Sequence, residues 1–236
     1  MALFITILIF FSLAGCSRTE GEDPEFDFLV QTEPTAYDGV EVPSARIEEL
    51  RQEIADHEAE VTELVSAINR TAVLHKLLAQ EFLRQQMYEP ALDELESAMA
   101  IQAENAVLYY WAAVASARSA KAHYDEAGRY LDRSLDYYER AIAIRPNYKE
   151  ALYGISVLLA FELNRPVEAL PYISRLASLE TAAVDVKFLH ANILVRVERY
   201  EDALEIYDEL SQSAPSETTR MRAQENRDRL LREVQR

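Results

Sequence analysis

The sequence predicts an all-α solenoid, in which pairs of antiparallel helices stack one after another. A short motif that opens a helical pattern begins at Tyr88, Tyr124, Pro166 and Tyr200, at spacings of 36, 42 and 34 residues. Apolar residues after each start follow the i, i+3, i+4 spacing of an amphipathic helix. Only five glycines occur in 236 residues, which argues against a turn-rich all-β fold. A recurrence of about 34 residues on a helical pattern is typical of stacked helix pairs.

The N-terminus, residues 1–15, has the pattern of an export signal. Residues 3–13 are apolar apart from Thr6 and Ser12, a run too short for a membrane span, which takes about 20 residues. The following Leu13-Ala-Gly-Cys16 resembles the lipobox of bacterial lipoproteins. That resemblance implies cleavage before Cys16, acylation of this cysteine, and a body that faces the periplasm. By the family's sorting rules, Ser17 rather than an aspartate implies the outer membrane.

An acidic tether is expected over residues 16–43. Pro24, Pro34 and Pro43 interrupt any regular element there, and acidic side chains dominate. The expected role is a solvated linker that lifts the folded part off the membrane. Docking of the short apolar piece at residues 26–30 onto the body is the alternative.

Residues 44–71 predict one long amphipathic helix, with Ser44 as its N-cap. In a parallel homodimer its flanking pairs would be Arg46 with Arg51 and Glu53 with Glu58, which carry like charges. Self-association of another geometry, antiparallel above all, and packing as the N-terminal cap of the array are the alternatives. The coiled-coil-like series that raises the question repeats in steps of three and four: Ile47, Leu50, Ile54, His57, Val61, Leu64 and Ile68.

Residues 72–236 resemble an array of tetratricopeptide repeats (TPRs). In that family each repeat is two antiparallel helices, with small residues at positions 8 and 20, where the helices cross closely. Ala79 and Ala91 stand at these positions in residues 72–105, and Ala191 and Ala203 in residues 184–217. The resemblance implies about four helix pairs.

The second repeat is stretched. Ala115 fits position 8, and Tyr124 and Ala127 fit positions 17 and 20. Seven further residues then precede a second ending at Pro146, so its second helix is expected to be about two turns longer than usual. A frame shifted by two residues in its first helix is the alternative.

The remaining elements complete the array. The third repeat begins at Lys149 and fits the pattern after one extra residue in the turn near Asn164. Residues 220–236 predict a final helix, and a terminal cap is what an open-ended stack needs for solubility.

Charge and motif content exclude several functions. A net charge of −17 argues against nucleic-acid binding, since phosphate contacts need clustered Lys and Arg. The chain has no Gly-rich phosphate loop, no Gly-x-Ser-x-Gly motif and no His-Glu-x-x-His pair. Its four histidines fall on different predicted elements. We therefore expect no catalysis, no metal and no cofactor.

The functional surface implied by the TPR resemblance is the concave groove, lined by the first helix of each pair. Its positions are aromatic in the middle and basic at the ends, which suits a peptide with aromatic anchors. Filling of the superhelix interior by these aromatics is the alternative. The chaperone-binding clamp pattern of the family is met by Lys76 but not by Gln80. The predicted lining is Lys76, Gln80, Arg84, Tyr109 (or Tyr110), Tyr153, Val157, Phe161, Phe188, Asn192 and Arg196.

The expected function is that of a membrane-anchored TPR adaptor of the bacterial cell envelope, which holds an unidentified protein or peptide partner. The alternative is an accessory, ligand-handling component of a periplasmic solute-transport system. A through-pore or a closed cavity would distinguish the second from the first.

Overall fold

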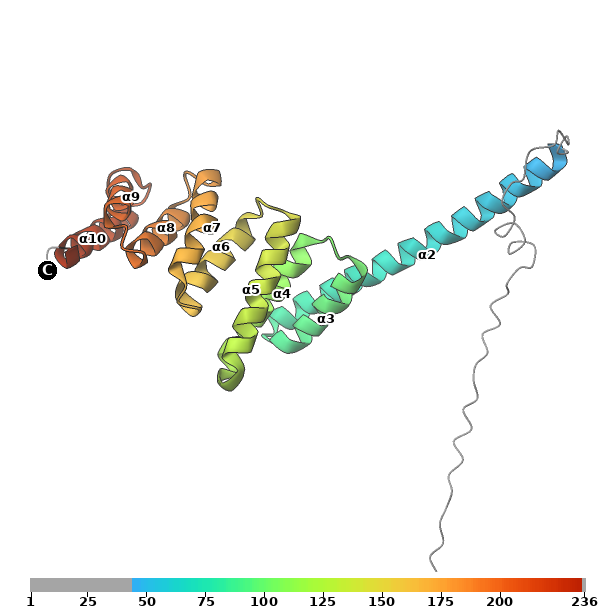
Figure 1. Ribbon diagram of the computed structural model, residues 1–236, viewed down its shortest axis with the longest axis horizontal. Helices are drawn as coiled ribbons and strands as arrows, with labels where there is room; N and C mark the ends of the chain where they lie inside the picture. Colours follow the sequence, from blue (N-terminus) through green and yellow to red (C-terminus); the bar gives the residue numbers. More distant parts are fainter. Residues whose placement is uncertain (1–43, 235–236) are drawn as a thin grey trace, which may run out of the picture. The chain divides into compact units, whose positions relative to one another are not determined.

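The computed structural model of the chain describes residues 44–234, and every regular element in that range is helical (Figure 1). The all-α prediction is therefore confirmed. The predicted signal, Cys16 and the tether lie outside the described residues. Within residues 44–234 no helix is both long and apolar enough to cross a membrane. The helices are α2 (Ser44–Arg84), α3 (Tyr88–Ile101), α4 (Ala106–Ala122), α5 (Ala127–Ile144), α6 (Lys149–Val157), α7 (Pro166–Leu179), α8 (Val184–Arg196), α9 (Tyr200–Ser213) and α10 (Glu217–Val234), with a 3-10 turn η1 (Tyr124–Glu126) and a π-helix η2 (Leu158–Glu162).

The chain divides into two compact units, whose boundary falls within α2 between His57 and Glu58. The described part of the first unit is the beginning of α2. It carries ion pairs one turn apart, such as Arg46 with Glu49 at 2.8 Å. The helix continues past residue 71 without a break. The predicted long helix and the first helix of the first repeat are therefore one element.

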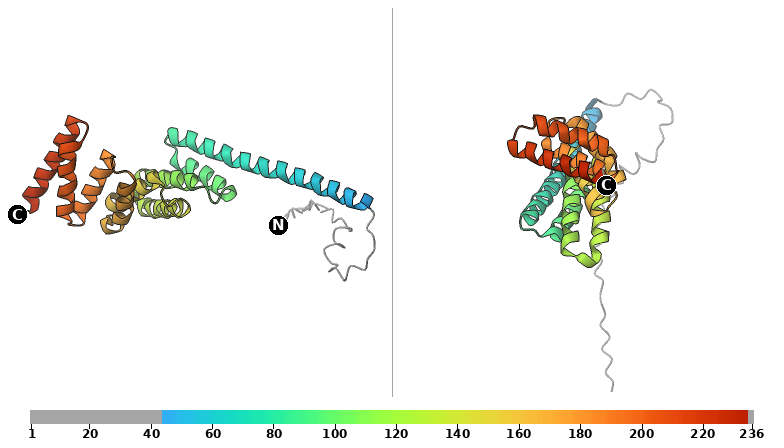
Figure 2. Two further views of the ribbon diagram at one scale, coloured as in Figure 1. Left: turned by 90° about the horizontal axis from the view of Figure 1, so that it is seen from above. Right: turned by 90° about the vertical axis from the view of Figure 1, so that its left-hand side faces the viewer.

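In the second unit, α2 to α9 form four helix pairs, and α10 follows as a cap. Each helix from α3 onward contacts the next one along the chain, and both views in Figure 2 show α9 and α10 side by side. The small residues predicted at the crossings of the first and fourth pairs are fully buried: Ala79, Ala91, Ala191 and Ala203 are each 0% exposed. Small side chains let the two backbones of a pair approach closely.

Three of the four pairs share one turn between their helices. Gln86, Asn164 and Glu198 each adopt a left-handed φ, of 59°, 54° and 61°. Such a residue ends a helix by letting a later N–H reach back to a free carbonyl. The Met87 N–H donates to the Phe82 carbonyl at 2.9 Å, and the Arg199 N–H donates to that of Leu194 at the same distance.

The second pair departs from this pattern, and the register expected for its second helix is wrong. Tyr124, expected at a packing position, is 90% exposed and lies in η1. The small crossing residue is Ser134, which is fully buried and donates to the Ala113 carbonyl at 2.8 Å. Ser116 donates in the same way to the Tyr130 carbonyl at 2.9 Å. These two hydrogen bonds fix α4 against α5 seven residues away from the expected match at Ala127.

The extra length of the second pair is shared between its helices. α5 has 18 residues against 14 in α3, α7 and α9, about one turn more rather than two. α4 has 17 residues against 13 in α8. Both helices therefore run past the point where the other pairs turn.

The extra residue of the third repeat lies in η2 rather than in the turn near Asn164. The Leu163 N–H donates to the Leu158 carbonyl at 2.9 Å, five residues back, and the Arg165 N–H reaches the Leu159 carbonyl at 2.7 Å. A π-helix takes up one more residue per turn than an α-helix, so it holds the addition without a longer loop.

Within residues 44–234 the core consists of three clusters along the stack. The first lies around Leu95 and the last around Leu210, and a larger central cluster includes Leu152 and Ile173. Tyr109 and Tyr137 pack against both the first and the central cluster, and Leu170 against both the central and the last. Each cluster thus touches its neighbours through only a few side chains.

Candidate binding groove

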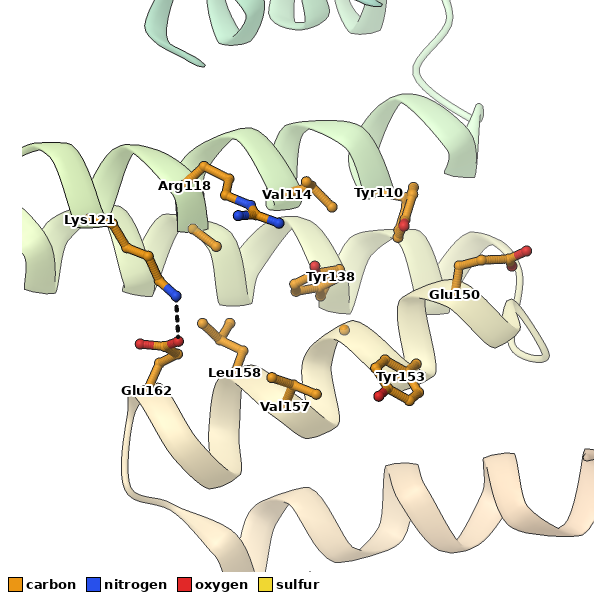
Figure 3. A pocket seen from close by; sticks show the side chains of 12 residues that line it. Tyr110, Val114, Arg118, Lys121, Tyr138, Glu150, Tyr153, Val157, Leu158 and Glu162 are labelled. Carbon is orange, nitrogen blue, oxygen red and sulfur yellow. Dashed lines mark ion pairs between the residues drawn. The ribbon is translucent and has the colours of Figure 1, made fainter. Parts of the chain in front are cut away.

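A hollow of about 310 Å³ opens between α4, α5 and α6 (Figure 3). α4 supplies one wall, with Tyr110, Val114, Arg118 and Lys121 on a single helical face. α6 and η2 supply the facing wall, and Tyr138 of α5 forms the floor. The complete lining is Tyr110, Val114, Ala117, Arg118, Lys121, Tyr138, Glu150, Tyr153, Gly154, Val157, Leu158 and Glu162.

Gly154 is the residue that lets α6 lie against the floor. A Cβ atom at this position would stand 2.5 Å from both Cζ and Oη of Tyr138. The Tyr138 side chain is itself only 5% exposed, so it has little room to move away. Burial raises the pKa of Tyr138 far above its usual range, and the floor of the hollow is therefore neutral at physiological pH.

The charges of the hollow lie on its walls. Lys121 Nζ lies 3.2 Å from Glu162 Oε1, an ion pair that joins α4 to η2. Arg118 is exposed, and within residues 44–234 it makes no hydrogen bond or ion pair. Figure 3 shows its guanidinium extending toward the space between α4 and α6. A cation without a counter-ion in a chain of net charge −17 is available to a ligand.

A second hollow, of about 400 Å³, adjoins the first and shares Tyr110, Glu150 and Tyr153 with it. Burial raises the pKa of both tyrosines, and Glu150 and Asp185 add to the rise at Tyr110 and Tyr153, respectively. The two hydroxyls therefore stay neutral. The lining of this hollow also includes Asp185 and the ion pair of Lys149 with Glu180. We call the two joined hollows the α4–α6 groove.

Three of the predicted residues meet in a third hollow, of about 260 Å³, near the C-terminus. The Arg196 guanidinium lies 5.2 Å from the centre of the Phe161 ring, and its Nη2 donates to Asn164 Oδ1 at 2.5 Å. Asn192 accepts a hydrogen bond from the Tyr207 hydroxyl at 2.8 Å. The predicted polar residues of this hollow therefore already have partners within the chain.

Two predicted aromatics do not line a groove. Tyr109 points into the helix packing, with its ring 6.4 Å from that of Tyr137, and the neighbouring Tyr110 lines the hollow instead. Phe188 is 6% exposed because the Arg222 guanidinium of α10 lies 3.8 Å from its ring centre. For Phe188 the structure agrees with the alternative interpretation, interior filling.

In the structure, the basic residues predicted at one end of the groove do not lie with the aromatic residues predicted in its middle. Lys76, Gln80 and Arg84 lie on α2 and line none of the hollows described above. Arg84 forms an ion pair with Glu81. Of the predicted strip, Tyr153, Val157 and the alternative Tyr110 come together.

Arg118, Lys121 and Glu162 were not predicted. Their signal was present in the sequence, because Tyr110, Val114, Arg118 and Lys121 follow the i, i+4, i+8, i+11 spacing of one helix face. Recognising it required the register of the stretched repeat, which the sequence left ambiguous.

Within residues 44–234 no three His, Cys, Asp or Glu side chains lie close enough together to hold a metal ion. Histidines in this range have partners of other kinds. His75 Nδ1 lies 2.6 Å from Glu94 Oε2, and His190 Nε2 lies 3.3 Å from Ser174 Oγ. Burial lowers the pKa of His190, which favours its neutral form.

Known proteins of similar sequence and structure carry the same repeats. No family model matches the chain. A TPR repeat-containing protein of Borreliella burgdorferi is 23% identical over 175 residues, which cover 73% of this chain and 76% of that protein.

Three solved structures have the same arrangement of helices. MamA from residue 41 onward, from Desulfovibrio magneticus RS-1, is 18% identical over 69% of this chain and 94% of its own, with a TM-score of 0.55. YrrB, described as a TPR protein with an unusual peptide-binding site, is 18% identical over 72% of this chain and 87% of its own, also at 0.55. A thermophilic TPR protein of Thermus thermophilus is 17% identical over 79% of this chain and 96% of its own, at 0.52. The chain therefore has the fold of a tetratricopeptide-repeat array.

Proposed function

We propose that this protein is a membrane-anchored adaptor of the bacterial cell envelope, which holds a partner protein by taking one of its peptide segments into the α4–α6 groove. The observation that carries the proposal is Arg118, an exposed guanidinium that lines the groove beside Tyr110 and Tyr138 and makes no hydrogen bond or ion pair within residues 44–234. The peptide-binding site named for YrrB supports a peptide as the kind of ligand.

The chemistry of the groove specifies the segment. A guanidinium binds a carboxylate through two parallel hydrogen bonds, so an acidic side chain or a C-terminal carboxylate would lie at Arg118. Tyr110 and Tyr153 offer large, rigid apolar surfaces for an aromatic or aliphatic anchor. At the far end, Asp185 would repel a second acid, whereas Glu180 is paired with Lys149. The expected ligand therefore has one acidic group, followed by an apolar residue and then neutral or basic residues.

Arg118→Glu is expected to weaken peptide binding at least about 10-fold, because it places a carboxylate against the carboxylate of the ligand. The probes are peptides selected on the wild-type protein from a display library of short random sequences. Their affinities for the variants would be measured by fluorescence polarisation. Selected sequences should carry the acidic group next to an apolar residue.

The matched control is Arg129→Glu, the same reversal at an arginine of α5 that lines none of the described hollows. It should leave affinity unchanged. If Arg118→Glu binds the selected peptides as well as Arg129→Glu does, the α4–α6 groove is not the binding site.

The membrane part of the proposal rests on Leu13-Ala-Gly-Cys16 and is tested separately. Cys16→Ser is expected to abolish incorporation of a labelled fatty acid and to move the protein from the membrane to the soluble fraction. Several acyl chains on one residue would hold the protein stably, whereas one chain would not. Retention of the variant in the membrane fraction would refute acylation at this residue.

A solute-handling role is the second candidate, and it needs a cavity closed to solvent. Two of the hollows described above, of about 310 and 400 Å³, fall in the low part of the roughly 300–1,000 Å³ range of small-ligand sites, and the third, of about 260 Å³, falls below it. No feature of residues 44–234 described above favours this role over peptide binding.

A further inference from the structure

Helix α2 exposes an unusual number of large apolar side chains. Within residues 61–78, eight of them are 42–64% exposed. Exposed large apolar side chains that gather on one face of a helix normally mark an interaction site. The residues are Val61, Leu64, Val65, Ile68, Val73, Leu74, Leu77 and Leu78.

Some of these exposed side chains lie on the same face of α2 that contacts α3, in the turns before that contact begins. α3 packs on the face of α2 that carries Ala72 and Ala79, which are 1% and 0% exposed. Val61, Val65 and Ile68 precede these alanines at steps of four, three and four, so they lie on the same face of the helix. The side chains are small where α3 covers them and large where it does not.

The partner best suited to this face is another helix with the same spacing. Val61, Leu64 and Ile68 belong to the heptad series that begins at Ile47, with β-branched residues at the a positions. Carried forward by the same count, the series includes Thr71, His75 and Leu78. Thr71 and Leu78 are exposed, whereas His75 is partly buried and contacts Glu94 of α3. We propose that α2 pairs with α2 of a second copy of this chain in an antiparallel coiled coil.

Charge at the flanks selects the antiparallel direction. Two parallel copies would place Arg46 against Arg51 and Glu53 against Glu58. Like charges at these flanking positions disfavour pairing. In an antiparallel pair related by a two-fold axis, one helix can instead be moved along the other by whole heptads, until no acidic flanking residue of one copy faces an acidic residue of the other.

One antiparallel alignment satisfies this condition, with Val61 facing Leu64 of the second copy. It places Glu60 beside Ala67 and Glu58 beside Val65, so neither acid faces another. If the alignment is shifted by one heptad, Glu58 faces Glu58 of the second copy, and Glu60 faces Glu60 of the second copy. By the same count, the favoured alignment sets Arg46 opposite Glu81, a pair of unlike charges.

The first test measures the mass of the full chain carrying Cys16→Ser, in mild detergent, by light scattering. Twice the chain mass is expected. Val61→Glu combined with Ile68→Glu should give the mass of a single chain, with the helical circular dichroism unchanged, because both side chains are exposed. The control Val167→Glu, at a 70% exposed position of α7, should leave the dimer intact. A single-chain mass for the parent, or a dimer that survives the double change, overturns the proposal.

The second test fixes the direction, and it uses the absence of any cysteine other than Cys16. Ile54→Cys and Thr71→Cys are placed in separate chains that carry Cys16→Ser. In the proposed alignment residue 54 faces residue 71 of the other copy, whereas identical residues lie about 25 Å apart along the axis. Disulfide formation needs Cα atoms within about 7 Å. Cross-linking is therefore expected only when the two variants are mixed. Cross-linking of either variant alone would indicate a parallel pair and overturn the proposal, as would no cross-link at all.

Discussion

Leu152→Ala is expected to lower the free energy of unfolding by about 2–5 kcal/mol, the cost of a large-to-small change with its residual cavity. Leu152 is 0% exposed and belongs to the central cluster, between the first and last helix pairs. Surrounding side chains such as Ile155 and Ile173 are also fully buried, so they have little freedom to fill the space. Urea denaturation followed by circular dichroism measures the loss.

The position of the cavity in the stack should decide which helices loosen. In a repeat array each unit contacts only its neighbours, so a weak central unit exposes both sides. Leu210→Ala is the matched control, because Leu210 is only 2% exposed but lies in the C-terminal cluster. Hydrogen exchange should increase in α4 to α7 for Leu152→Ala and mainly in α8 to α10 for Leu210→Ala. Identical exchange patterns would mean that the three clusters unfold as one.

Gly154→Ala is expected to cost about 1–3 kcal/mol of unfolding free energy, by overpacking. The added methyl group would stand 2.5 Å from Cζ of Tyr138, and α6 would have to move away from α5. Since both residues line the α4–α6 groove, affinity for the selected peptides should fall as well. The thermal midpoint and the peptide titration measure the two effects.

Gly128 provides the control for this substitution. It lies in α5, and a Cβ atom there would meet nothing within 4 Å. Gly128→Ala should therefore stabilise the protein by about 0.5–1 kcal/mol, through helix propensity alone. Combining Gly154→Ala with Tyr138→Leu should cost less than the sum of the two single changes, because the smaller side chain leaves room for the methyl group. An additive double mutant would show that the Tyr138 ring is not the obstacle.

The regular repeats could be read from the sequence because their close crossings admit only small side chains. Ala79 with Ala91, and Ala191 with Ala203, have the family spacing and are all buried. Such positions fix the register of both helices at once. The helix pairs and their order follow from this constraint and from the spacing of the apolar residues.

The stretched repeat could not be assigned in this way. A shift of seven residues is almost two full helical turns, so it preserves the apolar face and leaves periodicity unable to decide. The structure decides through two serine hydrogen bonds, from Ser134 to Ala113 and from Ser116 to Tyr130. These are contacts between residues 14 to 21 positions apart, and no local pattern reports them.

The predicted groove residues were right or wrong for similarly specific reasons. Tyr109 and Tyr110 point about 100° apart around α4. A one-residue uncertainty in the register was therefore enough to assign the groove to Tyr109, which packs between helices, instead of to Tyr110. Phe188 is covered by Arg222, which comes from the capping helix. Tyr153 lines the groove as expected, because the added residue of its repeat follows it in the chain.

At the π-helix Leu158–Glu162, the insertion of one residue changes which side chain lies at the rim of the groove, as a substitution would. One residue inserted into a helix turns everything that follows it by about 100° around the axis. Here the wider turn confines that rotation to the last residues of the helix, and Glu162 ends within reach of Lys121. Helix pairs of this kind can therefore acquire a new charge at the rim of a groove by insertion, with the loop and the stacking of the next pair preserved.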